Sequence, residues 1–161
     1  MILLNSKQKV AETPYSFQDR FRDIQRIAII YPEKQQWLRI ARYTLQRLYN
    51  LPERFHFLIM RPPGTDIRFR STNFQYGDML YAPVDEERSA LHSRFMEFDP
   101  NMLLQLEPQP DARLIRLLES LPIGLKIGFG PEDSGLNIVY MQNKTSFYEK
   151  NLLNLIALIE T

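Results

Sequence analysis

Short apolar runs alternate along the chain with segments of helical periodicity. The clearest case is the stretch 26–50, in which the β-branched run RIAIIY is followed by Pro32 and an amphipathic segment. An apolar run without polar alternation is typical of a strand covered on both faces, as in parallel sheets. Pro32 lacks the N–H that a sheet requires, and its fixed φ suits the start of a helix. We therefore predict a buried strand over 27–31 and a covering helix that ends near Asn50.

The helix predicted after Pro32 has one apolar face. Residues spaced three and four apart share one side of a helix, and here they are Trp37, Ala41, Thr44, Leu45 and Leu48. We predict that this face packs on the sheet and that Trp37 serves folding. Arg39 and Arg42 lie off the stripe and are expected in solvent.

Three further apolar runs predict strands parallel to the first. They cover residues 55–60, 102–106 and 123–127. An outer strand is expected over 136–141. Helices are expected over 112–121, where Asp111 can cap the first turn, and after the capping box Ser146–Glu149.

Strands that alternate with helices at this spacing form βαβ units. The sequence therefore predicts a single α/β domain over 1–161, Rossmann-like, with a mainly parallel sheet of about four to six strands flanked by helices on both faces. Residues 1–14 are expected to form a flexible arm, followed by a short helix near 17–24.

The segment 65–100 has a weaker pattern. Residues 66–70 alternate and predict a short edge strand or an extended loop, and 77–82 predict a strand. A brief helical turn is expected at 85–88, and 95–98 are interpreted as a connection. The glycines from Gly128 to Gly135 lack the spacing of a dinucleotide fingerprint and predict a turn.

Composition narrows the chemistry. The absence of cysteine excludes disulfides and thiolate catalysis, and with two histidines a His-rich metal centre is not expected. His56 is interpreted as a packed residue with one hydrogen bond. The apolar runs are too short to span a bilayer, and Met1–Leu4 do not resemble a secretory signal. We expect a cytoplasmic protein without a cofactor or metal.

Charge is distributed unevenly between the two halves of the chain. Residues 1–75 contain 13 Lys and Arg against 6 Asp and Glu, and residues 76–161 contain 7 against 13. The basic residues are scattered singly, so we favour mutual neutralisation in the folded protein over a nucleic-acid surface.

Aromatic residues accompany two arginines in the middle of the chain. Phe69, Phe74, Tyr76 and Tyr81 lie near Arg68 and Arg70 in the sequence. Such a segment can stack bases or sugars, or it can pack a small core under a long loop, which we favour. The paired carboxylates at 85–87 and 132–133 are interpreted as solvated.

The expected ligand site lies at the carboxyl edge of the parallel sheet, where open α/β folds bind their ligands. Residues that follow the predicted strands supply the candidates. They are Glu33 as a weak candidate base, and Lys34, Arg61 and Glu107 as candidate ligand-binding residues.

The order of elements resembles that of a known family. A short helix leads into RIAIIYP, followed by LRIARYTLQRLYN, FHFLIM, NMLLQLEP, IGLKIGFGPEDSGLNIVYM and a closing helix. This pattern is similar to the N-terminal, acceptor-side half of heptosyltransferase-like glycosyltransferases of family 9, which have the two-domain GT-B fold. It also resembles small single-domain bacterial proteins of that type.

The resemblance implies a Gly-Asp pair directly after the first strand, with the Asp as catalytic base. This chain instead has Tyr31-Pro32-Glu33-Lys34 at that position, and we expect no second, donor-binding domain. We therefore predict a non-catalytic binding or interaction module. Its candidate partners are a second copy in a homodimer, another protein, or a sugar or nucleotide ligand. The alternative is a sugar- or nucleotide-related enzyme with Glu33 as base and with Arg61 and Lys34 binding anionic groups.

Overall fold

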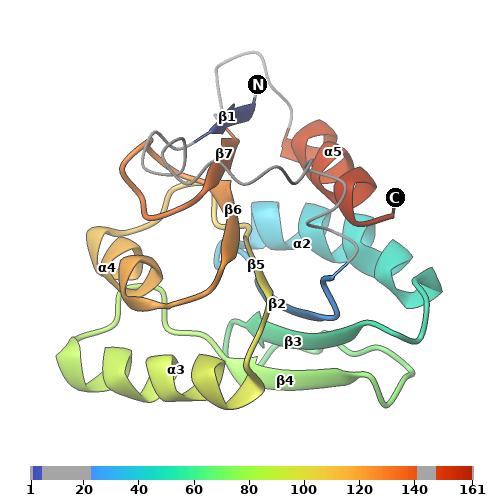
Figure 1. The fold of residues 1–161 in the computed structure, drawn as a ribbon, viewed down its shortest axis with the longest axis horizontal. Helices are drawn as coiled ribbons and strands as arrows, with labels where there is room; N and C mark the ends of the chain where they lie inside the picture. The colour runs from blue at the N-terminus through green and yellow to red at the C-terminus, as the bar shows by residue number, and fades with distance from the viewer. Residues whose placement is uncertain (1, 5–22, 141–147, 161) are drawn as a thin grey trace.

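The protein is a Rossmann-like α/β domain built on one central sheet (Figure 1). The computed structural model describes residues 2–4, 23–140 and 148–160. Its sheet has seven strands in the order β1-β7-β6-β5-β2-β3-β4. The strands are β1 (Ile2–Leu4), β2 (Arg26–Ile30), β3 (His56–Arg61), β4 (Phe74–Asp78), β5 (Met102–Gln105), β6 (Leu125–Phe129) and β7 (Ile138–Tyr140).

The parallel core of the sheet confirms the sequence prediction. β2 pairs in parallel with β3 on one side and with β5 on the other, and β5 pairs in parallel with β6. β4 and β7 extend this parallel sheet, whereas β1 pairs antiparallel with β7. The total exceeds the expected four to six strands because β1 is a short strand added at the edge.

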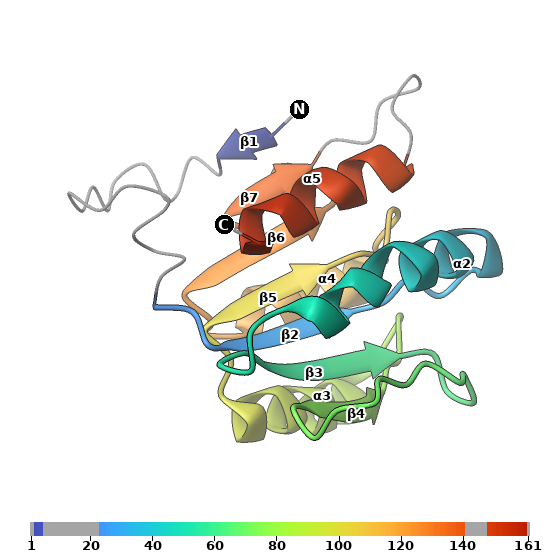
Figure 2. The same cartoon turned by 90° about the vertical axis from the view of Figure 1, so that its right-hand side faces the viewer.

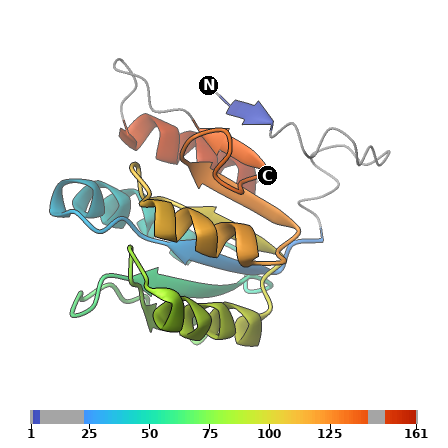
Figure 3. The same ribbon diagram turned by 90° about the vertical axis from the view of Figure 1, so that its left-hand side faces the viewer.

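Two helical layers cover the sheet, one on each face. Figure 2 shows α2 and α5 in front of the strands, and Figure 3 shows α3 and α4 in front of the opposite face. Their bounds are α2 (Gln35–Thr44), the short 3-10 helix η2 that continues it (Leu45–Asn50), α3 (Asp85–Phe98), α4 (Ala112–Ser120) and α5 (Tyr148–Glu160). Successive residues of a strand point to opposite faces of the sheet and so belong to two separate apolar clusters. In β2, Ile27 and Ile29 pack under α2, whereas Ala28 and Ile30 pack under α3 and α4.

The helix after Pro32 packs through nearly the predicted face. Ala41, Leu45 and Leu48 are buried, and so is Leu38, which the spacing did not include. Trp37 is half-buried at the margin of this face, and its ring packs edge-to-face with Tyr148 of α5 at a centroid distance of 5.1 Å. The centre of the buried face is therefore displaced by about one residue toward Leu38.

The prediction of a brief turn at 85–88 and a connection at 95–98 was wrong. Both segments belong to the 14-residue helix α3. The side chain of Glu87 accepts the Val84 N–H at 3.0 Å and so satisfies a free donor at the helix start. Only three side chains of this helix are buried, and they are Leu91, Phe95 and Phe98. This sparse stripe explains why the helical period was missed.

Several boundaries also differ from expectation. The strand predicted over 77–82 lies at Phe74–Asp78, and the strand predicted over 123–127 ends at Phe129, so Gly128 belongs to β6 and not to the turn. Residues 66–70 form an extended loop. Most of the helix expected near 17–24 and most of the arm at 1–14 lie outside the described residues, as does the start of the capping box at 146–149. The described end of that expected helix, residues 23–24, is not helical.

Candidate functional site

The carboxyl ends of β2 and β5 lie side by side at the centre of the sheet. The chain leaves β2 toward β3 on one side, and β5 lies on the other side, so the direction of strand addition reverses between them. In open α/β folds the crevice at such a switch point holds the ligand. Tyr31 to Lys34 follow β2 here, and Leu106 and Glu107 follow β5.

Glu107 is the buried acid of this edge, with 6% of its surface exposed. Its Oε2 accepts the Glu33 N–H at 2.8 Å, directly before α2. Gln105 fixes the backbone around it, since its Nε2 donates to the Glu107 carbonyl at 2.8 Å and its Oε1 accepts the Glu107 N–H at 2.7 Å. The same amide donates to the carbonyl of Phe129 at 3.0 Å. One polar network therefore joins the ends of β2, β5 and β6.

Burial raises the pKa of Glu107, and the charge of Glu33 adds to this effect. Backbone N–H groups of Glu33 and Gln109, together with the charge of Lys34, oppose it. The charges of Glu33 and Lys34 therefore both act on the carboxyl group of Glu107. The Glu33 and Lys34 side chains are exposed.

Replacing Glu107 by Gln is expected to change how stability depends on pH. Because the pKa of Glu107 in the folded protein lies above its ordinary value of 4.5, the folded state binds more protons than the unfolded chain between these two pKa values. Glu107 therefore contributes stability that is lost as pH rises through this window, and Glu107→Gln should remove this pH-dependent contribution. Urea unfolding of both proteins between about pH 4 and pH 7 measures the effect. A difference in unfolding free energy that stays constant across this range would contradict it.

Two buried tyrosines bind backbone carbonyls at this edge from opposite layers. The Tyr81 hydroxyl donates to the Tyr31 carbonyl at 2.6 Å, and the Tyr148 hydroxyl donates to the Leu106 carbonyl at 2.6 Å. Tyr81 belongs to the α3 and α4 layer and Tyr148 to the α2 and α5 layer. Burial raises the pKa of both phenols, and the charge of Glu107 raises it further. Both therefore remain hydrogen-bond donors at neutral pH.

Arg61 does not face the crevice. Its Nη1 donates to the Ile67 carbonyl, and its guanidinium lies 4.5 Å from the centre of the Tyr76 ring. The sheet edge thus brings Glu33, Lys34 and Glu107 together, while Arg61 supports the loop that follows β3.

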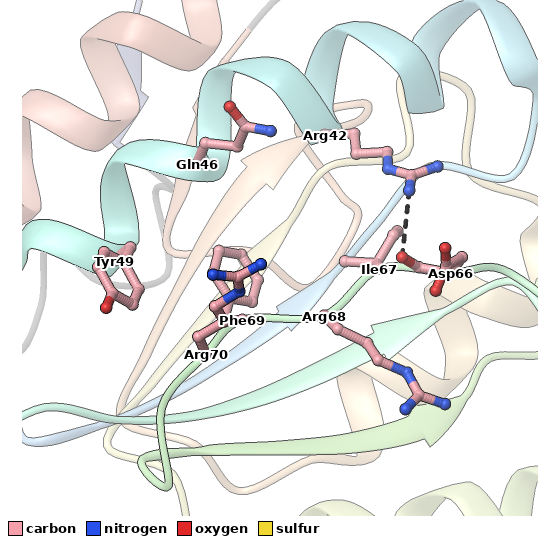
Figure 4. A pocket seen from close by; sticks show the side chains of 8 residues that line it. All are labelled: Arg42, Gln46, Tyr49, Asp66, Ile67, Arg68, Phe69 and Arg70. Atoms are coloured by element: carbon pink, nitrogen blue, oxygen red, sulfur yellow. Dashed lines mark hydrogen bonds between the residues drawn. The ribbon is translucent and has the colours of Figure 1, made fainter.

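A second site lies beside that loop. A groove of about 420 Å³ opens between α2, η2 and residues 66–70 (Figure 4). We call it the arginine groove, and its lining residues are Arg42, Gln46, Tyr49, Asp66, Ile67, Arg68, Phe69 and Arg70. Figure 4 shows Arg42 and Gln46 on the helical side and the remaining arginines on the loop, with the Arg68 guanidinium pointing away from α2.

The loop of the arginine groove is fixed by side chains from three directions. Arg42 Nη2 donates to the Asp66 carbonyl at 3.1 Å, and Arg61 binds the next carbonyl, that of Ile67. The Tyr76 hydroxyl accepts the Phe69 N–H at 2.7 Å. The Phe69 ring stacks on Phe74 at 4.3 Å. Ile67 and Phe69 therefore point inward, and the arginines between and after them point outward.

Some features of this groove were predictable from the sequence. The alternation at 66–70 and the aromatic neighbours of Arg68 and Arg70 were recognised, and the packing interpretation is confirmed for the rings of Phe69, Phe74 and Tyr76. The position of Arg42 opposite the loop was missed, because a contact between residues 24 positions apart has no periodic signature. His56, interpreted as packed, is instead exposed at the start of β3.

Comparison of the chain with protein-family models, with curated proteins and with solved structures found no match. The described residues contain no cluster of His, Cys, Asp and Glu that could hold a metal ion. None of the helices in the described ranges is both long enough and apolar enough to cross a membrane.

Proposed function

We propose that this protein is a non-catalytic binding module built on a Rossmann-like domain similar to the acceptor half of a GT-B glycosyltransferase. The two backbone carbonyls that buried tyrosines cap at the carboxyl edge carry this proposal. Tyr81 and Tyr148 occupy the space beside β2 and β5, and their hydroxyls bind the two carbonyls that begin the connecting loops. A substrate that bound these two carbonyls would have to compete with both hydroxyls.

The alternative, a sugar- or nucleotide-related enzyme, requires a positioned base. A general base must reach the proton that it removes and needs a pKa suited to the reaction. Glu107 has the raised pKa, which is the feature that favours this alternative, but its carboxylate binds the Glu33 backbone. Glu33 itself is exposed, and Arg61, the proposed anion ligand, binds Ile67 and Tyr76.

An activity assay tests the proposal. Purified wild-type protein incubated with ADP- and UDP-sugars, with and without a sugar acceptor, is expected to release no nucleoside diphosphate above the buffer rate. The same preparation of Glu33→Gln and Glu107→Gln provides the control for contaminating enzymes. Release by the wild-type protein that is lost in either variant would establish the enzyme and reject the binding module.

A further inference from the structure

We infer that the arginine groove binds a small phosphorylated molecule that carries a ring, either a nucleotide or a sugar phosphate. This inference rests on the binding role proposed above and gives it a location away from the sheet edge. The groove has the volume of a small-molecule site, since such sites enclose roughly 300–1,000 Å³.

The charge in the groove is not balanced by the residues that the structure describes. Three arginines line it against one carboxylate, that of Asp66. The guanidinium groups of Arg68 and Arg70 form no hydrogen bond or ion pair with the described residues, whereas Arg47 pairs with Glu160 at 2.8 Å. Arg42 uses one nitrogen for the Asp66 carbonyl and keeps further N–H donors. The groove therefore offers donors and positive charge to an anion.

Guanidinium groups match the geometry of phosphate oxygens. Arginine binds phosphate through paired, charge-assisted hydrogen bonds, which are stronger than neutral ones. The rest of the lining suits a ring. Tyr49 is 56% exposed and can stack on a planar or sugar ring, and Gln46 offers an amide that both donates and accepts.

The space beyond Arg70 extends the site. A second pocket of about 350 Å³ shares Tyr49 and Arg70 with the first, so the two are adjoining parts of one depression. Asn73 and Ser71 contribute polar groups to this second part. A phosphate at the arginines thus leaves room for the ring of the ligand next to Tyr49.

Two carboxylates favour a small ligand over a nucleic-acid strand. Asp66 lines the first pocket, and Glu53 lines the second. A long polyanion that followed the depression would pass both acids, and the repulsion from each carboxylate would weaken its binding. A compact ligand can place its phosphate at Arg70, which both pockets share, without extending past either acid.

The loop is ordered before a ligand arrives. Arg61, Tyr76 and the stacked ring of Phe74 hold its backbone at Ile67 and Phe69. Binding therefore does not have to supply the entropy needed to order the loop backbone, and a preorganised site binds more tightly for this reason.

Titration calorimetry on the full chain tests the inference with pyrophosphate, AMP, ADP, glucose 1-phosphate, adenosine and glucose as probes. We expect the phosphorylated probes to bind the wild-type protein and the two unphosphorylated probes not to bind. The double variant Arg68→Gln/Arg70→Gln should weaken binding by at least about tenfold, which is the loss of roughly one charge-assisted contact. The matched control Arg39→Gln/Arg116→Gln removes the same charge from exposed positions outside the groove and should bind as the wild type does.

The probes separate the two sources of phosphate. AMP binding more tightly than glucose 1-phosphate, with that advantage lost in Tyr49→Ala, identifies a nucleotide, and the reverse order identifies a sugar phosphate. Equal affinity in both double variants, or no binding of any phosphorylated probe at millimolar concentration, would overturn the inference. Tighter binding of a single-stranded RNA oligomer than of AMP would overturn the small-molecule class. None of these results depends on nucleoside diphosphate release, so this inference and the proposed function can fail separately.

Discussion

Gly128→Ala is expected to destabilise the protein by about 3 kcal/mol, at the upper end of what overpacking usually costs. Gly128 pairs with Gln105 across β5 and β6 at the centre of the sheet. A Cβ at this position would lie 2.1 Å from the Gln105 carbonyl oxygen and 2.7 Å from the Gln105 Cβ. Backbone atoms of a central strand cannot move aside without separating the two strands.

The added methyl group would also disturb the polar network at the sheet edge. Gln105 carries the hydrogen bonds to Glu107 and Phe129, so a shift of β5 weakens them together. The melting temperature should fall by about 6–12 °C for a domain of this size. Gly124→Ala is the matched control, because a Cβ there meets nothing within 4 Å. Equal melting temperatures for the two variants would show that β5 and β6 do not approach so closely.

The parallel core was predictable because each of its strands has its own signal. The apolar runs at 27–31 and 102–106 have little polar alternation, and both strands are covered on two faces. Their helices carry capping and period signals, as Asp111 illustrates by accepting the Arg113 N–H at 2.8 Å at the start of α4. In these elements the local sequence signals and the burial in the folded protein favour the same secondary structure.

The two tyrosine hydrogen bonds at the sheet edge could not be predicted from the sequence. Tyr81 reaches a carbonyl 50 residues away, and Tyr148 reaches one 42 residues away. Neither tyrosine has a motif that marks its hydroxyl for backbone capping. The candidates Glu33, Lys34 and Glu107 were placed together because strand ends meet at one edge, but position alone did not reveal that two tyrosines cap the carbonyls there.

The predicted neutralisation between the basic and acidic halves of the chain holds for some arginines and not for others. Neutralisation between the halves of the chain occurs for Arg47, which pairs with Glu160 across 113 residues. It does not occur for Arg68 and Arg70, which line the arginine groove without a partner among the described residues. Scattered positions in a sequence can therefore still converge, since Arg42 reaches the same groove from another element.

Trp37→Ala is expected to destabilise the protein by about 3 kcal/mol, the lower end of the range for removing a buried aromatic side chain. Trp37 joins the two helices of one layer, because its indole packs against the Tyr148 ring in an edge-to-face arrangement. Tyr148 in turn packs against Phe129 at 5.2 Å and caps the Leu106 carbonyl. The loss is expected at the lower end because the indole lies at the margin of the core and is only partly buried.

The comparison that isolates this effect uses the neighbouring exposed position. Arg39→Ala should change stability by no more than about 0.5 kcal/mol, as exposed substitutions usually do. Arg42 is less suitable as a control, since it donates to the Asp66 carbonyl. Urea unfolding of Trp37→Ala, Trp37→Phe and Arg39→Ala should give a large, an intermediate and a negligible loss of unfolding free energy. If Trp37→Ala unfolds at the same urea concentration as Arg39→Ala, the contact between α2 and α5 does not stabilise this face. The hydrogen bond from Tyr148 to the Leu106 carbonyl would then form independently of Trp37.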